Sequence, residues 1–500
     1  MAGRYVLGID TSTTATKAIL VDADGTVVAT ASSEYAAETP QPLWSEQDPR
    51  LWWSGTCAAI RGALAAAGAT ADDVAAVGMD GQMHGMTLLD AAGAVLRPAI
   101  LWNDQRTAAE CDEIRAAVGR ERLIALTGNE ALPGLTAPKL LWVRRHEPDV
   151  WARIARVLLP KDAVRWWMSG DAAADVSDAS GMGLLDHRAR TWSGEVLDRL
   201  GIPAAWLPRL VEGPEVTGVV SAAAAAETGL RAGTPIVGGA GDQAANAVGL
   251  GIVDPGPLAL TLGTSGVVFA AADAPVHDPD GWFHAFCHAV PGRWHLMGVM
   301  QSAAGSLRWL RDAIAPGVPF ETLVAEAAAV PPGADGLLFA PYLSGERHPH
   351  PDPTIRGAFV GLTLGHGRGH LVRAVLEGVA FGLRDNLDRI RAIGAPVTSA
   401  RMSGGGTRSD TWRGILVDVL GVPLAGVATA EGAAFGAAVL AATGAGWYRD
   451  VAVAARAMVH PLPPVEPGPG AARYAELHGL FRQLYPALRG ISADLGKERP

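Results

Sequence analysis

The stretch "YVLGIDTSTTATKAILVDADGTVVAT" (5–30) decides the fold that we predict for this 500-residue chain. Apolar runs alternate in it with two polar turns, of which the first is crowded with hydroxyl side chains and the second contains Asp-Gly. Asp-Gly between apolar runs is typical of a tight turn that joins two strands. The stretch therefore predicts a meander of three strands at the start of the chain.

A weaker copy of this pattern, "PLALTLGTSGVVFAAA" (257–272), appears in the second half of the chain. It again reads as strand, turn rich in small hydroxyl residues, and strand. Strand-like and helix-like segments alternate elsewhere, with helices expected at about 50–67, 104–118, 150–168, 369–393 and 431–442. The alternation predicts the α/β class, and the repeated turn suggests two duplicated domains that face one cleft.

The length fits two large domains, because one hydrophobic core rarely organises 500 residues. We place the boundary near residue 250, which gives an N-terminal domain over 1–250, a C-terminal domain over 251–459 and a terminal segment over 460–500. The last begins with the Pro-rich connector "HPLPPVEPGPG" (460–470). Helical spacing of Tyr474, Leu477, Phe481 and Leu484 predicts a terminal helix that docks on the body and ends near Pro486.

The amino-acid composition and net charge indicate which kinds of binding partner the protein lacks. The chain is 49% hydrophobic and 18% charged, with a formal net charge of −10 and a pI near 5.7. An acidic surface disfavours nucleic acid and anionic membranes as partners, and no run of 18 apolar residues occurs. Cys57, Cys111 and Cys287 lie far apart without metal-finger spacing. We therefore predict a cytoplasmic globular protein with neither nucleic acid nor membrane as a partner.

The first turn carries a candidate phosphate site. Its residues follow a buried strand and are Asp10, Thr11, Ser12, Thr13 and Thr14. Backbone N–H groups and hydroxyls in such a turn suit phosphate oxygens, and an acid at the strand end suits Mg²⁺ held through water. The second turn offers a similar set in Gly263, Thr264 and Ser265. The alternative for each is an ordinary polar hairpin turn.

Other nucleotide signatures fit less well. The P-loop pattern GxxxxGK[ST] is absent, as are GxSxG and HExxH. "GAGDQA" (239–244) matches the loose dinucleotide pattern, but Asp242 would repel a pyrophosphate at that place. "MSGGGTRSDTWRGILVDVLG" (402–421) is more informative, because Gly404, Gly405 and Gly406 follow a strand and a helix begins near Ser409. Glycines allow a flat base to approach the backbone, so we favour a nucleotide pocket over a flexible loop.

Two further segments, "MDGQMHGMTLLD" (79–90) and "ILWNDQRT" (100–107), concentrate polar groups beside an indole. Polar donors and acceptors next to an aromatic face suit a polyhydroxylated ligand, because each hydroxyl needs a partner and the sugar C–H face needs an apolar one. The cluster comprises Asp80, Gln82, His84, Trp102, Asn103, Asp104 and Arg106. A lone histidine would more often be structural, and it is the density of the cluster that favours a sugar site.

"GGAGDQAANAVG" (238–249) places one acid, Asp242, in a stretch that is otherwise suited to burial. A buried carboxylate without a partner costs several kcal/mol, so its presence indicates either an ion-pair partner or a chemical task. A structural alternative is that Asp242 caps the helix that begins beside it.

With these segments in view, the chain resembles the FGGY carbohydrate kinase family. The resemblance runs in order through "LGIDTSTTATK", "MDGQMHGMTLLD", "LWNDQRT", "GGAGDQAA", "TLGTSG", "YLSGERHPHPDPTIRGAFVGL" and "EGAAFGAAVLAA". It implies two actin-like, ribonuclease H-like domains with a cleft between them, an N-terminal one for sugar and phosphate and a C-terminal one for the nucleotide. It also implies phosphorylation of the ketopentose D-xylulose at its 5-hydroxyl by ATP with Mg²⁺.

The resemblance assigns roles to residues of this chain. Asp242 would be the catalytic base and, with Asp10, would serve the metal. Met83, His84 and Gln243 would contact the sugar together with Trp102, Asn103 and Asp104, and the Gly404–Gly406 stretch would contact adenosine. Gln243 and His348 depart from the residues that are frequent in the family, which leaves the sugar preference open toward ribulose or glycerol. A non-catalytic actin-like ATPase and a homodimeric assembly also stay open.

Overall fold

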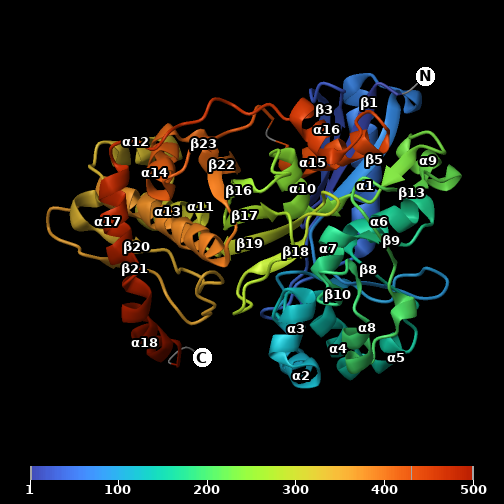
Figure 1. Ribbon diagram of the computed structural model, residues 1–500, viewed down its shortest axis with the longest axis horizontal. Helices are drawn as coiled ribbons and strands as arrows, with labels where there is room; N and C mark the ends of the chain where they lie inside the picture. The colour runs from blue at the N-terminus through green and yellow to red at the C-terminus, as the bar shows by residue number, and fades with distance from the viewer. Residues whose placement is uncertain (1–2, 430, 498–500) are drawn as a thin grey trace.

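The computed structural model describes residues 3–429 and 431–497 (Figure 1). Its first sheet has the strand order β13-β14-β5-β1-β2-β3, with β15 also paired to β5. The strands are β1 (Tyr5–Thr11), β2 (Ala15–Val21), β3 (Val27–Glu34), β5 (Val74–Gly81), β13 (Val216–Val219), β14 (Pro235–Val237) and β15 (Ala240–Gly241). β1, β2 and β3 are antiparallel neighbours, whereas β5 runs parallel to β1. The predicted opening meander is confirmed.

The second sheet repeats this pairing with other strands, in the order β18-β19-β17-β16-β22-β23. They are β16 (Gly256–Leu262), β17 (Gly266–Ala272), β18 (His284–Cys287), β19 (Trp294–Met300), β22 (Val397–Ser403) and β23 (Leu424–Ala425). β16, β17 and β19 form the antiparallel meander, and β22 joins β16 in parallel, as β5 joins β1. Two sheets of one topology confirm the α/β class and the predicted duplication.

Helices from both halves of the chain pack on the first sheet. α1 (Pro49–Ala67), α10 (Asp242–Gly249) and α15 (Gly432–Gly444) contact its strands. α9 (Ala222–Thr228) packs on α1, and α16 (Val451–Met458) packs on α15. α15 lies against β1, β5 and α10, and a Cβ at Gly436 would come within 1.8 Å of the Ala245 carbonyl oxygen. The glycine thus permits direct contact of the α10 and α15 backbones. The chain returns to the first sheet late in the sequence, while the domain boundary near 250 stays a prediction.

On the second sheet, α13 (Arg368–Ile393) contacts β17 and β19. The helices that pack on α13 are α11 (Ala304–Ile314), α12 (Phe320–Ala328), α14 (Asp410–Leu420) and α17 (Ala471–Phe481), and α18 (Leu484–Lys497) follows α17. Figure 1 shows all of them on the left. Tyr474, Leu477 and Phe481 of α17 are buried, as the helical spacing requires of a helix that docks on the body. The predicted end near Pro486 is wrong, because α18 begins at Leu484 and contains that proline in its first turn, where no intrahelical N–H bond is needed.

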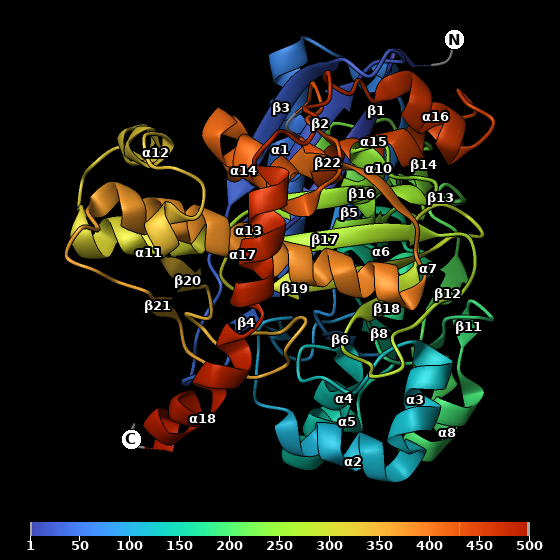
Figure 2. The same ribbon diagram turned by 60° about the vertical axis from the view of Figure 1, so that its left-hand side comes forward.

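A mostly helical region extends the first half of the chain, and most of it lies at the bottom of Figure 2. It contains α2 (Ala108–Val118), α3 (Arg120–Thr127), α4 (Thr136–His146), α5 (Pro148–Trp151), α6 (Pro160–Ser169), α7 (Val176–Ser180) and α8 (Gly194–Leu200). The single helix predicted over 150–168 is wrong: β8 (Arg156–Leu158) interrupts it by pairing with β6 (Thr87–Leu89), and Pro160 starts α6.

Short strand pairs complete the fold: β4 (Glu46–Gln47) with β7 (Ala99–Ile100), β9 (Ala173–Asp175) with β12 (Arg209–Val211), β10 (Leu185–Asp186) with β11 (Thr191–Trp192), and β20 (Leu338–Ala340) with β21 (Ala358–Val360). Among the described residues, no helix has both the length and the apolar character that a membrane span requires.

Candidate functional site

Three carboxylates meet at one edge of the first sheet. β1, β5 and β15 are parallel neighbours, and the register pairs Asp10 with Asp80 and Ala240 with Asp80. Because parallel strands end at the same edge, Asp242, which directly follows β15, joins the other two acids. Burial raises the pKa of Asp10 to about 6 and that of Asp242 to about 7. Burial and then the charge of Asp10 also hold the pKa of Asp80 well above its usual range.

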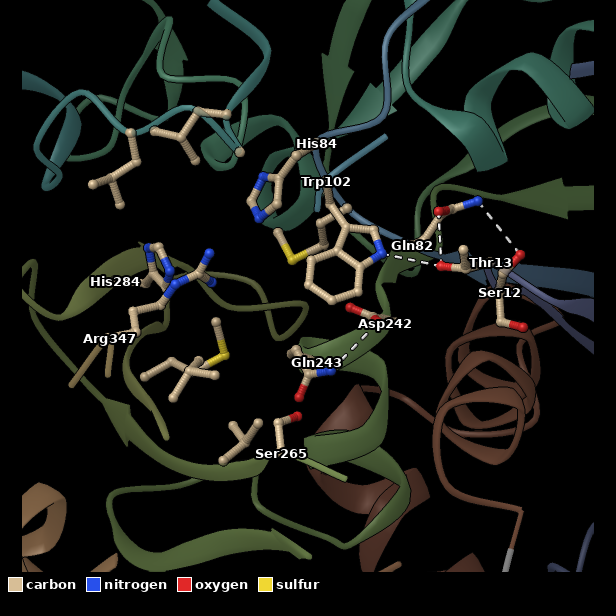
Figure 3. Close-up of a pocket in the computed structure, with 17 residues that line it drawn as sticks. Ser12, Thr13, Gln82, His84, Trp102, Asp242, Gln243, Ser265, His284 and Arg347 are labelled. Atoms are coloured by element: carbon tan, nitrogen blue, oxygen red, sulfur yellow. Dashed lines mark hydrogen bonds between the residues drawn. The ribbon is translucent and has the colours of Figure 1, made fainter. Parts of the chain in front are cut away.

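A cavity of about 230 Å³ opens at this edge and is lined by both halves of the chain (Figure 3). Its size is below the roughly 300–1,000 Å³ of pockets for drug-sized ligands, which suits a small ligand. The polar and aromatic lining from the first half comprises Ser12, Thr13, Gln82, His84, Trp102, Asp242 and Gln243, beside Met83. The second half contributes Ser265, His284 and Arg347. The cavity therefore brings together Asp242, part of the predicted sugar set and part of each predicted phosphate turn, namely Met83, His84, Trp102, Gln243, Ser12, Thr13 and Ser265.

Asp242 is the first residue of α10, and Gly241 occupies the N-cap position. Gln243 Nε2 donates to Asp242 Oδ2 at 3.3 Å. The preceding glycines are required by close packing: a Cβ at Gly239, where φ is +73°, would lie 1.9 Å from the Met79 carbonyl oxygen. These glycines let the turn pack directly against β5. The Asp242 carboxylate that follows faces the cavity, and its pKa is raised.

His84 presents a neutral imidazole to the cavity. Its Nδ1 lies 2.7 Å from the Gly181 carbonyl oxygen, which can only accept, so Nδ1 carries the proton and Nε2 is left as an acceptor. Burial lowers the pKa of His84 to about 3. The backbone at His84 is left-handed, with a φ of 67°, a conformation that costs energy for a residue with a Cβ. A neutral, oriented imidazole suits a sugar hydroxyl.

Trp102 lies at the rim of the same cavity with 40% of its surface exposed. Its Nε1 donates to Thr13 Oγ1 at 3.0 Å, and that hydroxyl donates in turn to Gln82 Oε1 at 3.0 Å. The indole therefore connects the sugar segment to the first phosphate turn.

The two turns differ in how their residues are used. Ser12 closes the first turn, because its Oγ donates to the Ala15 carbonyl and accepts from Ala15 N–H. Ser12 and Thr13 line the cavity, while Thr11 is fully buried and Thr14 is exposed outside the lining. In the second turn Ser265 lines the cavity, and the Thr264 carbonyl accepts from the N–H groups of Ala303 and Gly305.

Comparison with known proteins agrees with this geometry. Residues 5–249 match the N-terminal domain of the FGGY family of carbohydrate kinases, and residues 258–445 match its C-terminal domain. The chain belongs to the FGGY family of carbohydrate kinases. The xylulose kinase of Escherichia coli (strain K12) is 44% identical over 496 residues, which cover 97% of this chain and all of that protein.

Solved structures of FGGY relatives agree in fold. A structure described as a xyloylose kinase from Brucella ovis is 42% identical with a TM-score of 0.91, covering 97% of this chain and 100% of that one. The xylulose kinase of Rhodospirillum rubrum is 36% identical with a TM-score of 0.91, covering 98% and 100%. The predicted pair of actin-like, ribonuclease H-like domains is thereby confirmed, as is a carbohydrate kinase as the class of enzyme.

The structure corrects one residue of the predicted sugar site. Asp104 is fully buried. Its Oδ2 accepts from Ser45 N–H at 2.7 Å and from Arg106 Nη2 at 2.6 Å, and its Oδ1 accepts from the Arg106 backbone N–H and Nε at 2.9 Å each. A carboxylate engaged in this way fixes the loop that carries Trp102 and has no oxygen free for a sugar. Asn103 is exposed and lies outside the cavity lining.

Two cavity residues, His284 and Arg347, were missing from the predicted set. Arg347 belongs to the segment "GERHPH" (345–350), which was noted only for His348. His284 stands on β18 without a neighbouring motif that could have singled it out. In Figure 3 both reach the cavity from the side opposite Ser12 and Thr13. A guanidinium with five donors in a sugar pocket adds contacts for hydroxyl or carbonyl oxygens.

A second cavity of about 490 Å³ lies in the C-terminal part of this FGGY chain, between α11, α12 and the start of α14. Gly405, Gly406 and Ser409 line it. Ser409 caps α14 by accepting from Trp412 N–H at 3.1 Å. Gly404 lines an adjoining cavity of about 380 Å³, and its φ of 92° brings it close to the Leu262 backbone. The predicted nucleotide residues thus stand beside hollows large enough for a base.

The chemistry of the carboxylate edge fits a hydrated Mg²⁺. In the described ranges, 3–429 and 431–497, no three His, Cys, Asp or Glu side chains are grouped to hold a metal by themselves. Mg²⁺ is commonly held by one or two carboxylates with water and substrate phosphates. Asp10 and Asp242 supply such oxygens, and both buried oxygens of Asp80 lack a hydrogen-bond partner. Lys17, by contrast, forms an ion pair with Glu431, with 3.0 Å between Lys17 Nζ and Glu431 Oε2.

Proposed function

We propose that this FGGY kinase transfers the γ-phosphoryl group of ATP to the 5-hydroxyl of D-xylulose. The observation that carries the proposal is the single cavity in which Asp242, the sugar-facing His84 and Trp102, and the two phosphate turns meet. The 44% identity to the E. coli xylulose kinase over nearly the whole chain supports this substrate over ribulose or glycerol.

In the proposed reaction Asp242 accepts the proton of the 5-hydroxyl while that oxygen bonds to the γ-phosphorus. The bond from phosphorus to the β–γ bridging oxygen breaks, and ADP leaves with that oxygen. The transition state is loose, so most of the work is orientation and charge neutralisation. The raised pKa of Asp242 suits a base, which contributes roughly 10² to 10⁴ in rate. Mg²⁺, which Asp10 and Asp242 would hold, neutralises phosphate charge when bound.

The remaining residues bind and orient. His84 Nε2 accepts from a sugar hydroxyl, and the Trp102 face covers the C–H side of the sugar. Arg347 donates to oxygens at the end of the cavity away from the Ser12 turn. The hydroxyls of Ser12, Thr13 and Ser265 approach the phosphates from both halves. Closure of these two walls around the ligands would exclude water and limit ATP hydrolysis.

D-xylulose is expected to be the best acceptor in a substrate panel. A site built to hydrogen-bond each hydroxyl loses several powers of ten in kcat/KM when one bond is missing. kcat/KM should be measured with ATP and Mg²⁺ for D-xylulose, D-ribulose, L-ribulose and glycerol by coupled ADP release. Another acceptor that matches D-xylulose would contradict the substrate assignment while leaving the kinase class intact.

The two halves are expected to approach one another when ATP and sugar bind together. The motivation is that residues of both halves line the cavity. Small-angle scattering should show a smaller radius of gyration with both ligands than with either alone. A radius of gyration that stays constant under saturation would contradict closure.

The rival function, an actin-like ATPase without a sugar substrate, predicts turnover that sugar does not change. The polar and aromatic lining around His84 and Trp102 would then lack a purpose. A rate of ADP release that rises on addition of D-xylulose supports the kinase. A rate that none of the four acceptors changes favours the ATPase. A cytoplasmic location and a homodimer stay predictions.

A further inference from the structure

A buried group of charged side chains lies beneath the turn that precedes Asp242. We call it the lysine cluster; every member is fully buried, and it comprises Lys161, Asp162, Arg165, Asp175, Ser177 and Asp178. Lys161 Nζ lies 2.7 Å from Asp162 Oδ1, 2.8 Å from Asp175 Oδ1 and 3.1 Å from Asp178 Oδ2. α6 supplies the first three members, and β9 with α7 supplies the others.

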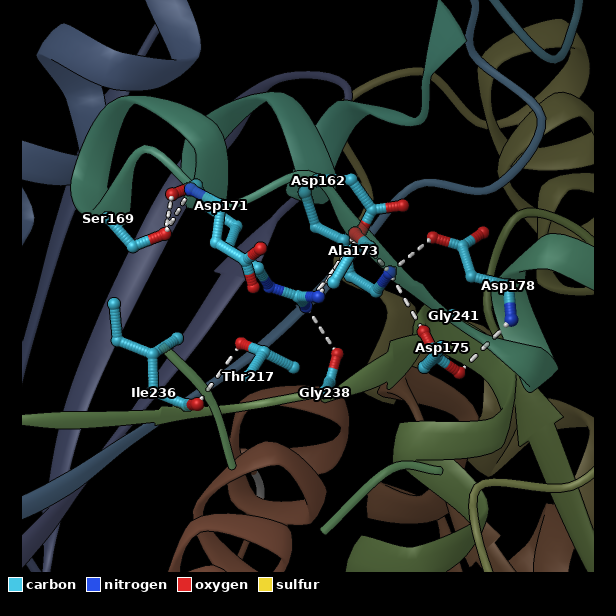
Figure 4. A network of polar contacts seen from close by, with 12 residues as sticks. Asp162, Ser169, Asp171, Ala173, Asp175, Asp178, Thr217, Ile236, Gly238 and Gly241 are labelled. Atoms are coloured by element: carbon cyan, nitrogen blue, oxygen red, sulfur yellow. Dashed lines mark hydrogen bonds and ion pairs between the residues drawn. The ribbon is translucent and has the colours of Figure 1, made fainter. Parts of the chain in front are cut away.

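The cluster holds both ends of the turn over residues 238–241. At one end, Arg165 Nη2 donates to the Gly238 carbonyl, while its Nη1 donates to Ala173 O at 3.1 Å. At the other end, Gly241 N–H donates to Ser177 Oγ at 3.2 Å. In Figure 4 Gly241 lies beside Asp175, and Gly238 lies across the network from Asp162. Since Asp242 follows Gly241 directly, these hydrogen bonds fix the position of the Asp242 backbone and therefore of its side chain.

The hydroxyl of Ser177 is itself held in one orientation. Ser177 Oγ donates to Asp175 Oδ2, which also accepts from Ser177 N–H at 2.8 Å. With its proton engaged in this way, the oxygen presents a lone pair to Gly241 N–H. The second oxygen of Asp175 contacts Lys161. A continuous chain of contacts thus runs from the ammonium group through the carboxylate and hydroxyl to the residue before Asp242.

The same short helix also touches the sugar side of the cavity. Gly181, directly after α7, accepts from His84 Nδ1 at 2.7 Å. A Cβ at Gly181 would lie 2.4 Å from that nitrogen. Ser177 of α7 therefore orients Gly241, and Gly181 at the end of α7 orients His84. The same short helix thus positions residues on two sides of the cavity.

We propose that Ser177, supported by Asp175 and Lys161, is a positioning residue that aligns the Asp242 carboxylate with the bound sugar. Buried ion pairs contribute little net stability compared with apolar packing, so their presence here is better explained by the orientation that they impose. The inference rests on the role of Asp242 as base in the proposed function. Ser177 does not line the cavity and acts only through the Gly241 backbone.

The test begins with Ser177→Ala, which removes one hydroxyl and leaves the charges of the cluster intact. We expect kcat to fall about tenfold, because displacement of a catalytic group by even about 1 Å can cost up to 10²-fold. KM for D-xylulose should stay within about twofold, because the sugar contacts are untouched. Thr228→Val is the matched control: the Thr228 hydroxyl is equally buried and donates to Ala224 O, but it lies on α9, away from the cavity. It should retain normal kcat.

A double variant separates positioning from general stability. If Ser177 acts through Asp242, Ser177→Ala should cost less than about twofold when it is introduced into Asp242→Asn. An equal loss in both backgrounds, or a Ser177→Ala variant with more than half of normal kcat, would overturn the inference and leave the base assignment in place. Asp242→Asn with a tenth or more of normal turnover would instead overturn the base assignment, and the positioning role would fall with it.

Discussion

Asp242→Asn is expected to lower kcat by on the order of 10³ while D-xylulose affinity stays within about tenfold. The substitution keeps the size of the side chain and its contact with Gln243, but it removes the negative charge and the ability to accept a proton. Because the proposed sugar contacts come from His84, Trp102 and the opposite wall, we expect binding to survive the loss of the base. kcat should be measured by coupled ADP release and sugar affinity by calorimetry.

A matched control for this prediction is Asp254→Asn. Asp254 is a partly exposed carboxylate that pairs with Arg293 and Arg456 on the surface. Loss of such a pair changes stability by less than about 1 kcal/mol, so turnover should stay normal.

The helix-cap alternative for Asp242 predicts normal turnover for Asp242→Asn as well, since Asn caps about as well as Asp. The position of Gly241 at the N-cap already argues against that alternative.

The sheet architecture was accessible from the sequence because its signals are local. Strand, polar turn and strand follow one another within residues 5–30 and again within 257–272, so neighbouring residues alone specify each meander. The parallel partners cannot be found in this way. The pairing of Asp10 with Asp80 joins residues 70 positions apart, and it alone reveals Asp80 as the third acid of the edge.

The wall of the cavity opposite the first phosphate turn was less predictable for the same reason. His284 and Arg347 reach it from the second half of the chain. No local pattern distinguishes His284, and the segment that contains Arg347 supports the resemblance without showing which of its side chains faces the cavity. Asp104 shows the converse error. A carboxylate in a polar segment looks available in the sequence, but Arg106, two residues further on, folds back and occupies it.

Local spacing also fails where a distant strand competes for a segment. Residues 150–168 have helical character, yet Arg156–Leu158 pairs with Thr87–Leu89 and the helix is divided. The return of α15 to the first sheet depends on Gly436, whose significance becomes visible only when the Ala245 backbone is seen against it. Both features follow from packing between segments remote in sequence.

Lys161→Met is expected to destabilise the protein by about 3–5 kcal/mol, the usual cost of removing one partner from a buried ion pair. Lys161 Nζ contacts carboxylate oxygens of Asp162, Asp175 and Asp178. Burial holds the pKa of Asp178 well above its usual range, while the charge of Lys161 opposes that shift. Methionine fills a similar volume without charge, so these buried carboxylates lose the cation that they surround. Because the unfolding entropy of a 500-residue chain is about 1 kcal/mol/K, the apparent melting temperature should fall by roughly 3–5 °C.

Lys17→Met is the matched control, because it removes the same charge from a pair that solvent reaches. Lys17 Nζ lies 3.0 Å from Glu431 Oε2, at a side-chain exposure of 38%. An exposed pair contributes less than about 1 kcal/mol, so the melting temperature should change by no more than about 1 °C. Equal shifts for the two variants would show that Lys161 does not neutralise enclosed carboxylates. A large shift for Lys161→Met alone means that the support beneath the Asp242 turn is maintained by charge balance, since the two substitutions differ only in what surrounds the ammonium group.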